Sequence, residues 1–284
     1  MDAIVARKMW RTLEPVHAMI YFTRRATEAY DGLGIPRDAG YFASRSAPMG
    51  AVSAEVVTAT FFNFYPAVVQ AGIPAAWSIA SPAAILEARF SAADTALREL
   101  LGDEVVGSSE LEWAAATARR ATEACDVAGR PLFAGHAGLD WPDEPLVVLW
   151  HALSLLREFR GDGHIAALVL AGVGPCEALH THIAAADGLL PADVLKVTRG
   201  WPEDDWQAAG DALRKRGWLT DDGSFTDAGR AARDQVEDAT DASAMAPWEA
   251  LGEETCDRLR ATIRPWSRAV VDSGVMQGRP LKLR

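Results

Sequence analysis

The stretch LKVTRGWPEDDWQAAGDALRKRGWLTDDGSFTDAGRAAR, from Leu195 to Arg233, decides the fold. Within it, the break Gly200-Trp201-Pro202 separates a short helix from a second helix that runs from about Glu203 to Arg216. After that helix, two short strands flank the tight-turn sequence Asp221-Asp222-Gly223. Two helices joined by a turn and followed by a hairpin predict a winged helix-turn-helix module over residues 195–233.

The charge of this module argues against binding to DNA. Its second helix, which would enter the groove, begins with Glu203, Asp204 and Asp205. These carboxylates complement the positive end of the helix dipole, but they would repel phosphate. From Lys196 to Arg233 seven basic residues balance seven acidic ones, and residues 234–257 add eight acidic residues and no basic one. We therefore expect no nucleic-acid partner.

The whole composition indicates a globular cytoplasmic protein. The chain has 284 residues, 49% of them hydrophobic, and a formal net charge of -11, which disfavours nucleic acid and anionic membranes as partners. Its three cysteines are far apart and form no CxxC pair, as in a reducing compartment. We find no signal peptide and no apolar run long enough for a membrane span. The excess of arginine over lysine is typical of GC-rich bacteria.

Apolar residues at spacings of three and four predict a mostly α fold. The loop 129–145, rich in proline and glycine, is the expected boundary between an N-terminal helical domain (1–135) and a helical domain (145–284) that contains the winged helix. We expect a helix over 14–30 with Pro15 in its first turn. We also expect a break at Gly161-Asp162-Gly163 and a kink or break at Pro265.

An internal sequence similarity suggests a duplication. Glu14-Pro15-Val16-His17 recurs in form as Glu177-Ala178-Leu179-His180, and each is followed by a helix that ends in an arginine and then by a proline. Two halves of this size would each make a compact domain, so the chain could be a tandem pseudo-dimer. A coincidence in an alanine-rich helical chain is the competing interpretation.

Several segments resemble one known family. They are LREFRGDGHIAAL at 156–168, Tyr41 to Pro48, TATFFNF at 58–64, and Arg199-Gly200-Trp201 with the hairpin that follows. In these the chain resembles an actinobacterial family of MarR-like winged helix-turn-helix proteins of unassigned function. The resemblance implies a helical fold with a winged-helix part, and it implies no particular reaction.

The densest group of ionisable residues lies at 157–164. There a neutral His164 beside Glu158 and Asp162 could act as a general base, so these three are the candidate catalytic residues. The competing interpretation is an inter-helix corner fixed by ion pairs.

Aromatic residues predict a cavity for a small ligand. The candidate ligand-binding residues are Tyr41, Arg45, Phe61, Phe64, Trp77, Arg160 and His17. Such a cavity, between the two halves, suits a small apolar or aromatic ligand with a polar or anionic group, and Arg45 is the natural anchor for an anion. Simple core filling is the competing interpretation.

The histidines do not define a metal site. Glu14/His17 and Glu177/His180 have the ExxH spacing of di-metal bundles, but no helix is expected before Glu14 to supply the first lone Glu. No metal site is predicted, the cofactor is unknown, and haem remains open. No GxGxxG, Walker A or GxSxG motif is present.

Three functions follow in order of preference. The first is a cytoplasmic small-molecule-binding protein on a winged-helix scaffold that has lost DNA binding. The second is a biosynthetic enzyme, either cofactor-independent or assisted by metal or haem, with His164 as base in the same pocket. The third is a ligand-responsive DNA-binding regulator, which would use Arg199, Arg214, Lys215, Arg216 and the wing. A homodimer is compatible with each of them.

Overall fold

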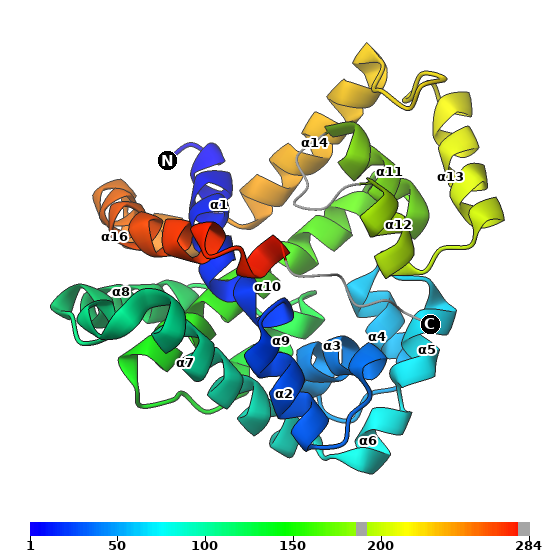
Figure 1. The fold of residues 1–284 in the computed structure, drawn as a ribbon. Coiled ribbons are helices and arrows are strands. Elements are labelled where there is room, and N and C mark those ends of the chain that lie inside the picture. Colours follow the sequence, from blue (N-terminus) through cyan, green and yellow to red (C-terminus); the bar gives the residue numbers. More distant parts are fainter. Residues whose placement is uncertain (186–191, 278–284) are drawn as a thin grey trace.

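The computed structural model describes residues 1–185 and 192–277, and these are mostly helical (Figure 1). This part of the chain contains no β-strand beyond an isolated antiparallel bridge between Leu219 and Phe225. The predicted mostly α fold is confirmed. The α-helices are α1 (Ile4–Ala18), α2 (Arg24–Gly32), α3 (Arg37–Ser46), α4 (Ala54–Phe61), α5 (Pro66–Gly72), α6 (Ala75–Ile79), α7 (Pro82–Val106), α8 (Ser109–Thr122), α9 (Pro131–Ala137), α10 (Pro145–Leu170), α11 (Pro175–Ala185), α12 (Ala192–Arg199), α13 (Glu203–Lys215), α14 (Asp227–Ser243), α15 (Ala246–Leu251) and α16 (Glu253–Asp272), and short 3-10 turns lie at Met19–Tyr21, Ala47–Met49 and Val275–Gln277.

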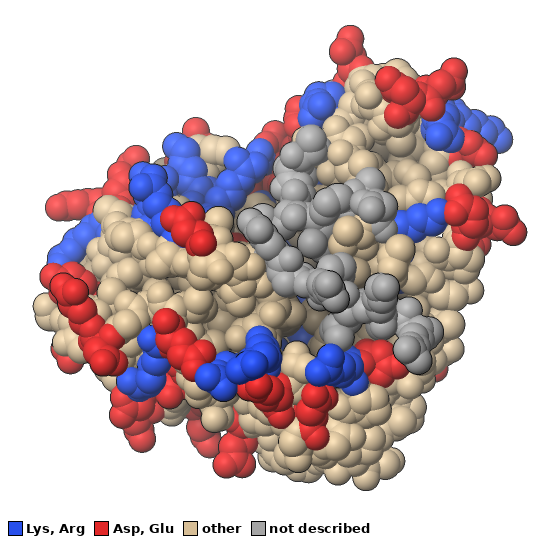
Figure 2. All heavy atoms as spheres, in the orientation of Figure 1, with Lys and Arg blue, Asp and Glu red and all other residues tan. Residues whose placement is uncertain are grey.

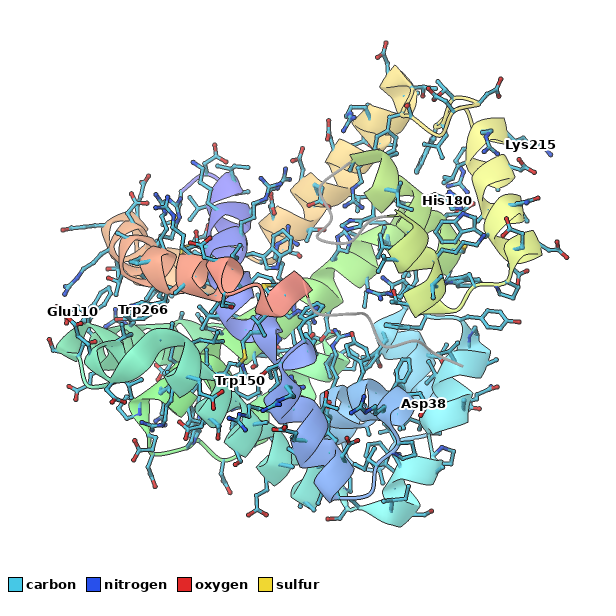
Figure 3. All side chains as sticks on the ribbon, in the orientation of Figure 1. Asp38, Glu110, Trp150, His180, Lys215 and Trp266 are labelled. Atoms are coloured by element: carbon cyan, nitrogen blue, oxygen red, sulfur yellow. The ribbon has the colours of Figure 1, made fainter. Side chains whose placement is uncertain are left out.

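The central helix α10 organises the main core. It packs against α8, α14, α9 and α1, and Trp150 in its second turn is buried (Figures 1 and 3). The last two helices return to the first part of the chain, where α16 packs on α1 and α15 packs on α8. Leu259 of α16 therefore shares a core with Met9 of α1. One core thus joins residues from both sides of the loop 129–145.

A smaller core lies where α10 ends. Leu168 of α10, Ala178 of α11 and Val236 of α14 are buried together, and Phe62 packs against them. Helix α13 packs on α11 at the outer edge of this lobe (Figure 1). Between the two helices, a ring nitrogen of His180 (Nε2) lies 3.0 Å from the carbonyl oxygen of Trp206 (Figure 3).

The predicted break at Gly161-Asp162-Gly163 is wrong, because α10 runs through it without interruption. Gly163 allows close packing instead of a turn. A Cβ atom on Gly163 would lie 2.5 Å from the hydroxyl of Ser243 and 2.8 Å from the guanidinium of Arg130. The absent side chain lets α14 and Arg130 approach α10.

Three other boundaries also differ from the predictions. The first helix begins at Ile4, so Pro15 lies inside it, because apolar residues such as Met9 extend the buried face upstream. The expected loop 129–145 contains α9, and Pro131 occupies its first turn. Helix α16 continues through Pro265 without ending.

Within the described residues, no single helix has both the length and the apolar composition needed to cross a bilayer. One bent pair, Pro66–Ile79 with Pro82–Val106, meets those two criteria together.

Candidate functional site

A cavity of about 280 Å³ is enclosed by α1, α3, α10, α11, α12, α14 and the connection between α4 and α5. Helices that are distant in the sequence meet here, and the lining combines aromatic rings with several charged side chains. Eight of the ten predicted site residues line this cavity, namely Tyr41, Arg45, Phe61, Phe64, Glu158, Arg160, Asp162 and His164.

Aromatic rings form one wall of the cavity. The Tyr41 ring lies 6.0 Å from that of Phe61 and 5.5 Å from that of Phe64, measured between centroids. The guanidinium of Arg45 lies over the Phe61 ring at 4.3 Å. Edge-on and tilted contacts at such distances favour a fixed arrangement of the rings. The wall can therefore offer a flat apolar surface to a ligand.

Glu158 is the centre of a buried ion-pair network. Arg45 donates to both of its carboxylate oxygens, at 3.2 and 3.0 Å, and Arg157 donates to it at 2.8 Å. Burial alone would raise the pKa of Glu158, but Arg157 and Arg45 outweigh burial and hold it well below its usual range. The Glu158 carboxylate is therefore a permanent anion that neutralises arginines, and it is a poor proton acceptor.

Asp162 caps a neighbouring helix. Its Oδ2 atom accepts the backbone N–H groups of Leu132 and Phe133, in the first turn of α9, at 3.1 and 2.9 Å. Burial is the main reason why the pKa of Asp162 rises to about 6, although those two hydrogen bonds oppose the rise. Asp162 and His164 both lie inside α10, so Asp162 caps the neighbouring α9 and not a helix that begins at His164.

His164 is held as one neutral tautomer. Its Nδ1 atom lies 2.9 Å from the hydroxyl oxygen of Thr240, and that hydroxyl donates its own proton to the carbonyl of Val236 at 2.7 Å. The hydroxyl can therefore only accept from His164, so Nδ1 carries the proton and Nε2 is the free acceptor. Burial lowers the pKa of His164 to about 4.

We expect the imidazole of His164 to stay neutral in solution at pH 5.5 and above. In ¹⁵N-detected NMR, its ring should keep a protonated Nδ1 and an unprotonated Nε2, and it should titrate near pH 4; a His164→Gln variant assigns the resonance. The pKa of His164 in the folded state lies below its value of about 6.5 in the unfolded chain. The stability that depends on a neutral His164 is therefore complete above about pH 6.5 and is lost as the pH falls toward 4. A titration midpoint near 6.5 would contradict this burial.

Two predicted ligand-binding residues lie outside the cavity. The indole of Trp77 donates to the carbonyl of Val52 at 2.8 Å, within the packing of α6. His17 is a core residue: its Nδ1 lies 2.9 Å from Ser154 and its Nε2 lies 3.0 Å from the Tyr21 hydroxyl. Both ring nitrogens are therefore occupied by protein partners. His17 adjoins only a much smaller void of about 20 Å³.

Arg199, which the sequence suggested only as a contact to DNA, lines the cavity. Its guanidinium lies over the Phe64 ring at 4.5 Å. No local sequence signal marks this role, because α12 and the α4–α5 connection meet only in the tertiary structure. Among the described residues, no group of three or more His, Cys, Asp or Glu side chains is arranged to hold a metal ion.

The turn between α12 and α13 is docked on the cavity wall. The carbonyl of Arg199 accepts the backbone N–H of Tyr65 at 2.9 Å, and the Trp201 indole donates to the carbonyl of Asn63 at 2.9 Å. The rings of Tyr65 and Trp201 meet edge to face at 5.3 Å. The turn at Gly200 and the aromatic wall therefore share one connection, residues 62–65.

A model of a helix-turn-helix family matches residues 6–277. The chain belongs to this helix-turn-helix family. No curated protein and no solved structure matches the sequence significantly. The matched residues include those that line the cavity as well as the α12–α13 turn.

The exposed helix of this helix-turn-helix protein carries mixed charge. Acidic residues occupy the first turn of α13 and basic residues its last turn. Figure 2 shows carboxylates next to cations along this edge of the molecule, and Lys215 projects away from the helix (Figure 3). Along α13, this face offers no continuous basic patch to a phosphate backbone.

Proposed function

We propose that this chain is a small-molecule-binding protein built on a MarR-like winged-helix scaffold. The observation that carries the proposal is the cavity of about 280 Å³, in which an aromatic wall faces a group of buried charges. Ligand sites typically combine apolar surface with a few fixed polar groups. The ligand of this proposal is a small aromatic molecule with a polar or anionic group.

The winged helix of the proposal, residues 195–233, comprises α12 and α13 and the hairpin that follows them. Besides the bridge between Leu219 and Phe225, the Thr220 N–H donates to the Ser224 carbonyl at 2.9 Å and the Thr226 N–H to the Trp218 carbonyl at 3.0 Å. In this proposal the module serves as a scaffold, since α13 begins with three carboxylates. An actinobacterial origin and a tandem duplication stay predictions.

A ligand-responsive DNA-binding regulator is the second candidate, because the chain belongs to a helix-turn-helix family. A fluorescence-anisotropy titration with random-sequence duplex at low salt separates the two. We expect no binding at micromolar protein. Tight binding that weakens steeply with added salt would restore the regulator and end the claim of lost DNA binding.

Ligand binding itself is tested by native mass spectrometry of freshly isolated protein, which should show an added mass that denaturation releases. We expect His164→Ala to reduce the occupancy at least tenfold, because Nε2 is a free acceptor at the cavity. The matched control is His180→Ala, whose ring lies between α11 and α13 outside the cavity lining. Bare protein in every preparation, together with unchanged thermal stability across a panel of aromatic ligands, would reject the proposal.

A further inference from the structure

Among the described residues, one partly buried arginine of the cavity, Arg199, has no carboxylate partner. No carboxylate of the described residues lies within 4.0 Å of its guanidinium, whose side-chain hydrogen bond goes to the Thr198 hydroxyl at 3.1 Å. Its Nε atom is buried and makes no hydrogen bond within the described part of the chain. A partly desolvated cation without a carboxylate partner favours an anion from outside.

The other buried arginines of the lining are already neutralised. Glu158 accepts from Arg45 and Arg157, as described above. Arg160 pairs with Asp241 at 2.8 Å, and Arg233 pairs with Glu237 at 2.7 Å. This distribution leaves Arg199 as the cation in the described lining that is partly buried and has no carboxylate partner.

The electrostatic potential beside Arg199 is positive. Burial alone would raise the pKa of the Tyr41 hydroxyl, but the cations Arg45, Arg199 and Arg157 together lower it. The phenol therefore sits in a field that favours negative charge, at the same wall where Arg199 stacks on Phe64. An anionic group bound here would experience attraction from more than one arginine.

We propose that the cavity binds a singly charged aromatic carboxylate, with its carboxylate on Arg199 and its ring against Tyr41, Phe61 and Phe64. This inference rests on the proposed function and adds the ligand class and the anchoring residue. A guanidinium matches the planar, two-oxygen geometry of a carboxylate. Arg199 carries a single charge inside the cavity, which matches one carboxylate better than a phosphate dianion. Arg45, the anchor expected from the sequence, is occupied by Glu158.

The test compares matched charged and neutral probes by isothermal titration calorimetry. The probes are benzoate and 2-naphthoate with their amides, benzamide and 2-naphthamide. We expect wild-type protein to bind at least one carboxylate at least tenfold more tightly than its amide. Arg199→Gln should remove that preference while affinity for the amide stays within threefold. Arg199→Lys should retain part of the preference for the carboxylate, since lysine keeps the positive charge but lacks the paired N–H donors of the guanidinium.

The matched control is Lys215→Gln, which removes an exposed cation of α13 outside the cavity lining. It should leave the preference for the carboxylate intact. Folding of each variant is checked by urea denaturation, and we expect unliganded Arg199→Gln to be no less stable than wild type, because it loses a partly buried charge that has no carboxylate partner among the described residues.

The outcomes separate the two proposals. If a carboxylate and its amide bind equally and Arg199→Gln changes neither, the anchor is wrong although the cavity still binds ligands. Arg199 is equally wrong as the anchor if Lys215→Gln removes the preference for the carboxylate as fully as Arg199→Gln does. If none of the four probes binds at millimolar concentration and isolated protein carries no ligand, both proposals are rejected.

Discussion

Replacement of Glu158 by Gln should lower the free energy of unfolding by about 3–5 kcal/mol, as is typical when one member of a buried ion pair is removed. The substitution keeps the shape of the side chain but leaves Arg45 buried without a carboxylate. Arg157 retains only its longer contact with Glu14, at 3.6 Å. Urea denaturation followed by tryptophan fluorescence measures the loss.

The matched control is Glu99→Gln on the surface. Glu99 also pairs with an arginine, Arg25, but about half of its side chain is exposed, and we expect little or no loss of stability because solvent screens the pair. In the double variant Arg45→Met/Glu158→Gln, the cost should be smaller than in Glu158→Gln alone, because the stranded charge is gone. Equal losses for Glu158→Gln and Glu99→Gln would mean that the network is not buried in solution.

Replacement of Gly200 by Ala should cost about 3 kcal/mol. Gly200 has a φ of +73°, where an L side chain costs about 1–2 kcal/mol. Its Cβ atom would also overlap the Cγ2 methyl of Val68 on α5, and such overpacking typically costs about 1–3 kcal/mol. The substitution therefore loosens the α12–α13 turn from the cavity wall. Urea denaturation gives the total.

Gly217→Ala is the control for the backbone term. Gly217 has a φ of +75° at the other end of α13, and a Cβ atom there would meet nothing within 4 Å. We expect it to cost only the conformational term, about 1–2 kcal/mol. In the double variant Gly200→Ala/Val68→Ala the overlapping Cγ2 methyl is gone, so adding Gly200→Ala to Val68→Ala should cost only the conformational part. If Gly200→Ala and Gly217→Ala lose the same stability, the turn is not docked on α5.

Local patterns in the sequence determined the secondary structure and much of the site. The glycine and proline of Gly200-Trp201-Pro202 ended one helix and began the next, because their backbone restrictions act over neighbouring residues. The density of charge at 157–164 singled out Glu158, Asp162 and His164, all of which line the cavity. Helix periodicity and local composition carry information of this kind, since neighbours in the chain are neighbours in a helix.

Tertiary structure alone decided which charges are used and which are free. The glycines around Asp162 predicted a turn, but α10 continues through them. Arg130 and Ser243 of α14 occupy the space that a side chain on Gly163 would fill. Arg45 and Arg199 are equivalent in the sequence, each an arginine near the end of a short helix. Glu158 neutralises Arg45, whereas no described carboxylate reaches Arg199. The physical reason is that the energy of a buried charge depends on partners within a few ångströms in space, and a linear sequence does not contain those distances.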